Sequence, residues 1–163
     1  MPDLPKRRDL LNKFSGPADI LEECERLAAC EREGRLVMVG GWTLAQNINH
    51  LAQLMHRTVD GFEPDLRVNP LLAWTMRTFM KKRLLTKLPP TGLKLSPAFQ
   101  RVFIAEPSLE TEAALDNMRK GVEKSKASNT RHPSPILGQL TIDEWNAFQS
   151  RHAEHHLSFA VPQ

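Results

Sequence analysis

Apolar residues recur at helical spacing in four long stretches of this chain, which predicts four long helices. The predicted helices cover residues 17–33, 43–60, 109–126 and 141–159. The main apolar stripe of the second helix consists of Leu44, Ile48, Leu51 and Met55. A shorter helix is predicted at residues 70–84, as an insertion between the second and third long helices. Residues 35–41 include two β-branched valines and are bounded by glycine, so they form either a short strand or an extended connector.

Capping residues mark the starts of three predicted helices. Thr43 with Gln46, and Thr141 with Glu144, have the spacing of a capping box, in which two side chains bond the first backbone N–H groups. Ser108 is expected to cap the third long helix. Because strand patterns are otherwise almost absent, the chain is expected to be all-α.

The connections between the predicted helices are rich in proline. Residues 88–107 contain four prolines, and no stable helix is expected there, because proline lacks a backbone N–H and clashes with the preceding turn. A connection of this length is uncommon, so it is expected to wrap the helices or cover a cleft. Residues 128–139 form a second proline-containing loop. The chain is therefore predicted to be a single domain, residues 1–163, folded as a four-helix bundle with a short extra helix and long proline-rich connections.

Composition and charge exclude several classes of protein. The chain is 40% hydrophobic and 25% charged, which is typical of a globular protein and not of a disordered one. Its net charge of +3 is too small to indicate a nucleic-acid partner, and the basic runs at residues 6–8 and 81–83 are typical of a solvated surface. No apolar run approaches the roughly 20 residues that cross a bilayer, so no membrane contact is expected.

Two further features indicate a cytoplasmic protein. The basic N-terminus lacks the apolar stretch of a signal peptide. Cys24 and Cys30 point about 240° apart on the first helix, so they cannot easily pair with each other. Two unpaired thiols are typical of a reducing compartment.

Six histidines are present, and three of them lie within five residues of the last predicted helix. His152 and His156 are four residues apart, which places both imidazoles on one face of that helix. With Trp145 set at zero, ideal helical steps place His152 at about 340° and His156 at about 20°, inside the apolar face, and His155 near 280°, at its edge. A bound metal satisfies imidazole nitrogens that are otherwise costly to bury. The alternative is a pair that is partly exposed or hydrogen-bonded within the core.

The third ligand is harder to assign from the pattern, and two imidazoles alone do not make a metal site. His50 and His56 each lie about 120° from the middle of the apolar stripe of the second helix, on opposite sides. His50 is modestly favoured, because it shares its flank with Leu54 and Asn47. The order H-x-E-H-H at residues 152–156 is not the H-E-x-x-H of zinc proteases, and neither a nucleophile elbow nor a nucleotide-binding glycine loop is present.

Two parts of the sequence resemble the DinB/YfiT-like superfamily of metalloenzymes. The segment GWTLAQNINHLA, residues 41–52, is similar to its motif G-x-W-[ST]-x-x-Q-x-x-x-H-L. The segments HPSPILGQLTIDEW, residues 132–145, and HAEHHLSF, residues 152–159, resemble a bacterial branch of that superfamily known only as a domain of unknown function. The resemblance extends from about residue 7 to residue 159.

The resemblance implies an up-down four-helix bundle in which His50, His152 and His156 bind a divalent metal. Zinc or nickel suits a site of three imidazoles. The last motif of the superfamily often continues as H-x-G-Q, whereas this chain has HLSF at residues 156–159. That departure leaves the ligands in place but does not transfer a particular substrate.

Three protein ligands leave one coordination position open, which is the arrangement of a catalytic rather than a structural metal. Characterised members of the superfamily include enzymes that use low-molecular-weight thiols. The resemblance therefore implies a metal-dependent enzyme acting on a small molecule, either a thiol-dependent S-transferase or a hydrolase. The alternative is a non-catalytic four-helix bundle that acts through a protein partner or as a homodimer, with the insertion helix near residues 74–84 as its contact surface.

Five other residues have simpler expectations. Trp42 and Trp145 are expected to be core residues or staple residues at the helix starts, in preference to forming a platform for a substrate. Glu154 is expected either at the surface or in contact with one of the histidines, on the side of the ring that faces away from the metal. His132 either shapes the turn before Pro133 or approaches the mouth of the site, and His56 is expected to be solvated.

Overall fold

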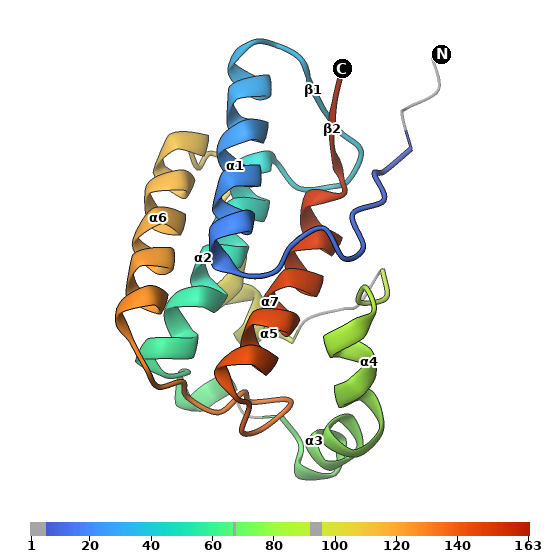
Figure 1. Cartoon of the computed structure of the whole chain (residues 1–163), viewed down its shortest axis with the longest axis vertical. Helices are drawn as coiled ribbons and strands as arrows, with labels where there is room; N and C mark the ends of the chain where they lie inside the picture. The colour runs from blue at the N-terminus through green and yellow to red at the C-terminus, as the bar shows by residue number, and fades with distance from the viewer. Residues whose placement is uncertain (1–5, 67, 92–95) are drawn as a thin grey trace.

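A computed structural model, which describes residues 6–66, 68–91 and 96–163, shows a mostly helical chain with one small two-stranded sheet (Figure 1). The four long helices are α1 (Pro17–Arg32), α2 (Leu44–Asp60), α6 (Thr111–Ala127) and α7 (Ile142–Leu157). Each begins and ends within two residues of its prediction. The periodicity of apolar positions was therefore sufficient to locate these helices.

Two capping boxes fix where α2 and α7 begin. The Thr43 hydroxyl accepts a bond from the backbone N–H of Gln46 (3.1 Å), and the Gln46 side chain accepts one from the backbone N–H of Thr43 (3.0 Å). Thr141 and Glu144 make the same reciprocal pair at 3.1 and 3.0 Å. Both predicted boxes are confirmed.

The prediction that Ser108 caps the third long helix is wrong. The backbone N–H of Leu109 donates to the carbonyl of Glu106 (3.0 Å), so Ser108 lies inside a turn that precedes the helix. The helix begins at Thr111, with Glu110 as an N-cap whose side chain makes no capping bond.

The main core lies between the four long helices. Its largest buried cluster includes Ile20 of α1, Ile48 of α2, Leu115 of α6 and Leu157 of α7. The predicted apolar stripe of α2 is buried in full. A second buried cluster joins α2 and α7 to the connection between α2 and α6, and Trp145 lies in it, which confirms the core position expected for that residue.

The directions of the four long helices differ from the expected up-down alternation. The side chain of Asn117 donates a hydrogen bond to that of Asn49 (2.8 Å), and both residues lie in the first half of their helices. Lys124 pairs with Asp60 (2.6 Å), and both lie near the ends of their helices. The two helices therefore run parallel. In Figure 1, α2 and α6 run downward while α1 and α7 run upward. Short loops force neighbouring helices to be antiparallel, but the connection at residues 61–110 is long enough to carry the chain back before α6 begins.

The connector that follows α1 forms a strand. β1 (Leu36–Met38) pairs antiparallel with β2 (Ala160–Pro162), with Val37 opposite Val161. Of the two possibilities for residues 35–41, the structure therefore shows the strand. β2 was not predicted, because a three-residue strand directly after a helix has too few residues to show a period of two.

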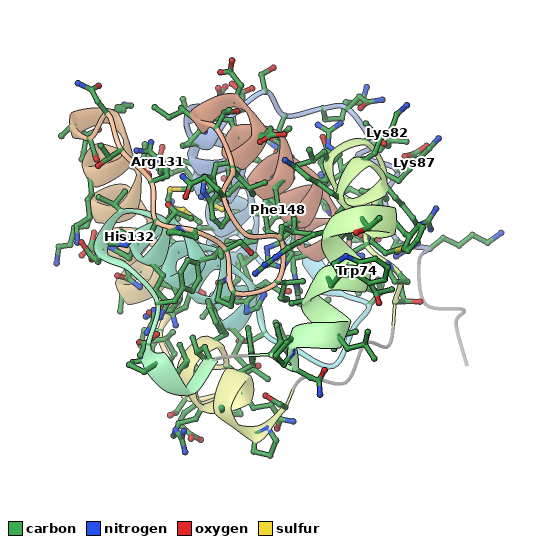
Figure 2. The ribbon with its side chains drawn as sticks, turned by 90° about the horizontal axis from the view of Figure 1, so that it is seen from below. Trp74, Lys82, Lys87, Arg131, His132 and Phe148 are labelled. Atoms are coloured by element: carbon green, nitrogen blue, oxygen red, sulfur yellow. The ribbon has the colours of Figure 1, made fainter. Side chains whose placement is uncertain are left out.

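The predicted insertion helix is present in three parts. α3 (Pro70–Thr75) continues into a π-helix, η2 (Met76–Met80), and then into α4 (Lys81–Thr86). Seen from below, Trp74 lies on this segment, and Lys82 and Lys87 lie toward its far end (Figure 2). A short 3-10 helix, η1 (Pro64–Leu66), precedes it.

The prediction that no helix forms in residues 88–107 is wrong. α5 (Pro97–Phe103) begins with Ser96 as N-cap, whose hydroxyl accepts a bond from the backbone N–H of Phe99 (3.5 Å). Pro97 is the first helical residue, where the missing N–H has no partner to lose, so it starts a helix instead of breaking one. Among all the helices of the described residues, α5 included, none is long and apolar enough to cross a bilayer.

Candidate metal centre

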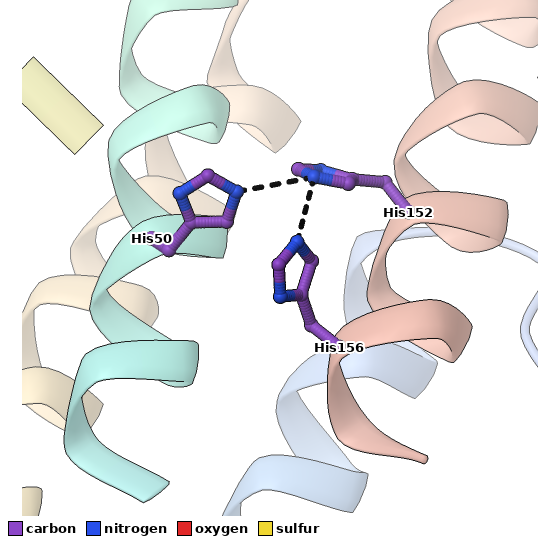
Figure 3. Close-up of side chains that lie close together, drawn as sticks. All are labelled: His50, His152 and His156. Carbon is purple, nitrogen blue, oxygen red and sulfur yellow. Dashed lines mark hydrogen bonds between the residues drawn. The ribbon is translucent and has the colours of Figure 1, made fainter. Parts of the chain in front are cut away.

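Three imidazoles meet between α2 and α7 (Figure 3). His50 comes from α2, and His152 and His156 come from successive turns of α7. The Nε2 atom of His152 lies 3.1 Å from the Nε2 atom of His50 and 3.1 Å from that of His156. The three ligand atoms all lie within 4.8 Å of one another. The structure thus brings together the three histidines selected from the sequence.

This spacing is close to what a metal ion requires. Two nitrogens that bind one tetrahedral zinc ion at about 2.1 Å lie about 3.4 Å apart. The two 3.1 Å separations therefore need only a small outward movement of the rings to admit an ion. The donor set, three imidazole nitrogens, suits zinc or nickel.

The tautomer of His50 follows from its surroundings. Its Nδ1 atom lies 3.1 Å from the backbone carbonyl oxygen of Phe103. A carbonyl only accepts, so Nδ1 carries the proton and the Nε2 lone pair is directed at the cluster. Proteins commonly orient a metal-binding imidazole in this way, through a hydrogen bond from the ring nitrogen that does not bind the metal.

The tautomer of His156 is set in the same way by Asn47. The Nδ2 group of Asn47 donates to the carbonyl of Thr43 (2.9 Å), which leaves its Oδ1 atom facing Nδ1 of His156 at 3.2 Å. That oxygen accepts a bond, so Nδ1 of His156 carries the proton. Its Nε2 lone pair also points into the cluster.

His152 cannot satisfy both of its neighbours. One proton on its Nε2 atom can be donated to His50 or to His156, but not fully to both. If its proton is on Nδ1 instead, all three Nε2 lone pairs face one another. Either way, at least one Nε2 atom of the cluster lacks a hydrogen-bond donor. A metal ion at the point where the three atoms converge would accept all three lone pairs.

A proton on one of the rings is a poor substitute for that cation, because a charged imidazole is disfavoured by burial. It lowers the pKa of His50 to about 4, against an ordinary value of 6.5. The pKa values of His152 and His156 lie well below 6.5, first because burial penalises the charged ring and then because a charge on one histidine repels a charge on the next. At pH 7 the three rings are neutral, which is the form that binds metal.

The cluster forms part of the wall of a cavity of about 530 Å³. Volumes of this size are typical of sites for small molecules. The cavity is also lined by α5, by the turn at residues 134–136, and by Pro89 and Pro90 before α5. The proline-rich connection therefore covers a cleft, one of the two roles expected for it.

The remaining histidines stay outside the cluster. His155 lines the cavity and is half-buried, as expected for the edge of the apolar face, and no described residue bonds its Nδ1 atom. His56 is not solvated as predicted, because its Nε2 atom bonds the carbonyl of Asn117 (3.0 Å). His132 lies against Gly61 and is not among the residues that line the cavity, so it does not approach the mouth of the site.

Two other expectations need correction. Trp42 is not a core residue, because it lines the cavity and stacks on the ring of His156 (centroids 5.3 Å apart, planes at 12°). Glu154 is neither exposed nor in contact with the cluster. Its carboxylate is fully buried and accepts bonds from Arg151 (2.8 Å) and from the backbone N–H groups of Lys13 (2.7 Å) and Phe14 (2.9 Å). Glu154 therefore attaches the segment before α1, which contains Lys13 and Phe14, to α7.

Three residues that support the cluster were not identified from the sequence. Asn47 had a weak signal, since it is a polar residue one turn before His50 on a buried flank. Phe148 stacks on His152 (5.9 Å, 15°) and is one turn before it on the apolar face of α7. The carbonyl of Phe103 had no signal, because nothing in the local sequence shows which helix will pack beside α2.

The fold and this site together define a mostly helical protein in which two long helices hold a candidate metal centre at a small-molecule cavity. The chain belongs to the family described as "Protein of unknown function (DUF1569)", which it matches over residues 13–163. Comparisons with curated proteins and with solved structures gave no match. The expectation of a family of unknown function is thereby confirmed, whereas the link of that family to the DinB/YfiT-like superfamily stays a prediction.

Proposed function

We propose that this protein is a metal-dependent enzyme that acts on a small molecule. One observation carries the proposal. Three Nε2 atoms converge on one point, and Phe103 and Asn47 hold two of the rings with their Nε2 lone pairs directed at it. A histidine cluster that served only to pack the core would have no reason to direct two lone pairs at a third Nε2 atom that cannot donate to both.

The location of the cluster supports a catalytic role for the metal. Three protein ligands leave a coordination position free, and these ligands border a cavity of about 530 Å³ that can admit a substrate. A bound zinc or nickel ion would act as a Lewis acid and lower the pKa of a coordinated water or thiol. The chain's own residues would orient the ligands, exclude bulk water and hold the substrate. Thiol-dependent S-transfer or hydrolysis is the reaction class we propose.

We also propose that the four long helices form a bundle of the DinB/YfiT type. Support comes from the motif at residues 41–52 and from the meeting of its histidine with the pair on α7, which is what the resemblance implies. The parallel course of α2 and α6 is a feature that any related structure should share.

Cobalt titration tests the proposal. Cobalt(II) replaces zinc in imidazole sites, and its visible spectrum reports both the number of ligands and the arrival of a new one. Tag-free protein stripped with a chelator should bind one equivalent of cobalt, and its spectrum should change on addition of a small thiol. His155→Ala, a neighbouring change outside the cluster, should behave like the wild type, whereas His152→Ala should not bind. A cobalt spectrum that no small ligand alters would indicate a closed structural site.

A second candidate function is a homodimer contact formed by α3, η2 and α4. Four large apolar side chains are exposed there: Leu71 (71%), Leu72 (53%), Trp74 (57%) and Phe79 (66%). The rings of Trp74 and Phe79 meet edge to face (5.9 Å, 86°), so they form one surface. Clustered exposed apolar residues of this kind are typical of interaction sites.

Sedimentation velocity tests this second candidate. If a second copy covers the surface, the wild type should sediment as a dimer and Trp74→Ser with Phe79→Ser as a monomer. Ile142→Ser is the matched control, because Ile142 is an exposed apolar residue on a different helix (38%). A wild type that remains monomeric at high concentration would rule out the homodimer.

A further inference from the structure

The cavity beside the three histidines has an aromatic lining. Trp42, Phe62, Phe99, Phe103 and Phe148 all border it, together with Leu54 and Ile136. These side chains come from α2, α5, α7 and three connections, so the apolar character results from the tertiary fold and not from one helix face. A flat apolar body can contact rings on several sides in such a space.

Aromatic rings also contact each of the three imidazoles. Trp42 stacks on His156 and Phe148 stacks on His152. Phe103 meets His50 edge to face (5.7 Å, 68°). The point where the Nε2 lone pairs converge is therefore surrounded by apolar surface, and a ligand reaching that point passes between rings.

Charged side chains are missing from the described part of the cavity wall. No Asp, Glu, Lys or Arg is among the residues that line it there. Ser134, one of its polar residues, already accepts bonds from the backbone N–H groups of Ile136 (3.2 Å) and Leu137 (3.1 Å) in its own turn. An ionic group on the body of the ligand, away from the metal, would lose its hydration in this cavity without gaining a charged side chain as a partner.

From these contacts we infer that the substrate of this site is an uncharged molecule with an aromatic or similarly flat apolar body and one electron-pair donor atom at its end. The donor atom would occupy the free coordination position, and the apolar body would lie among the rings. This inference rests on the proposed function, because it assumes that the three imidazoles hold a metal. It narrows the thiol substrates considered above to those without charged groups.

Three thiols distinguish this substrate class from others. Phenylmethanethiol is neutral and aromatic. Its para-carboxylate has the same ring and thiol with a negatively charged group added, and 2-mercaptoethanol has the thiol without the ring. Each is titrated into cobalt-loaded protein, and the change in the cobalt spectrum gives its dissociation constant. We expect phenylmethanethiol to bind at least tenfold more tightly than either of the other two.

Ile136 offers a matched pair of variants, since it lines the cavity and is not one of the three clustered histidines. Ile136→Lys should favour the para-carboxylate over phenylmethanethiol, because it places a positive charge in the cavity. Ile136→Leu should keep the wild-type order. Both variants should give the wild-type cobalt spectrum before any thiol is added, which shows that they are folded and metal-bound.

The outcomes separate the inference from the proposed function. If cobalt binds and all three thiols have similar dissociation constants, or if the para-carboxylate binds most tightly to the wild type, the inferred substrate class is wrong while the metal site stands. If cobalt does not bind, the proposed function itself is wrong.

Discussion

Acid should destabilise the metal-free protein through its buried histidines. His50 has a pKa of about 4 in the folded chain, against 6.5 when exposed. Between these two values the unfolded chain binds a proton that the folded chain does not, so stability falls as the pH falls. The stabilising contribution is complete above pH 6.5 and is lost as the pH approaches 4.

The magnitude follows from the same two pKa values. Lowering the pH from 8 to 5 should reduce the free energy of unfolding by about 2 kcal/mol through His50 alone, and the full shift corresponds to about 3 kcal/mol at lower pH. His152 and His156 shift in the same direction, so they add to this loss.

Urea denaturation followed by tryptophan fluorescence, at pH 8 and pH 5 with a chelator present, measures the effect. His50→Gln should lose about 2 kcal/mol less than the wild type over this interval, because glutamine does not titrate. Carboxylates elsewhere contribute equally to both proteins and cancel in the comparison. The reasoning fails if the two proteins show the same pH dependence, or if the wild type becomes more stable in acid.

Three further changes test other parts of the structure. Asn47→Leu should weaken zinc binding 10- to 100-fold in isothermal titration, because His156 loses the acceptor that orients it. Asn47→Asp should retain the affinity, and an Asn47→Leu variant that binds zinc as tightly as the wild type would show that this contact is not used. Glu154→Ala should lower the free energy of unfolding in urea by about 3–5 kcal/mol, because Arg151 is left buried without its carboxylate, and a small loss would contradict the buried pairing. Thr141→Ala should cost about 1 kcal/mol in the same assay, and no loss would show that the capping box adds nothing.

Local signals in the sequence located the long helices and two of the three clustered histidines. The spacing of His152 and His156 was sufficient because both the helix and its apolar face were evident from neighbouring residues. His50 was decided by a motif resemblance and not by periodicity. The structure shows why: the apolar stripe of α2 faces the main core, whereas His50 faces α7 from the flank.

The features that could not be predicted depend on contacts between distant segments. The cavity is lined by residues of α2, α5, α7 and the connections before α2, between α2 and α6, and between α6 and α7, and no local pattern records which of them will meet. The parallel course of α2 and α6 depends on the path of the long connection. Pro97 was misread because a proline that starts a helix and one that prevents it differ only in what precedes and follows them.

Metal content per chain tests the central claim most directly. Tag-free protein should be stripped, dialysed against zinc and analysed by elemental mass spectrometry, alongside alanine variants of His50, His152, His156 and His155. We expect one zinc ion per chain in the wild type and in His155→Ala, and strongly reduced zinc in the other three variants. A wild type without zinc, or an equal loss in His155→Ala, would contradict the proposed three-histidine metal centre.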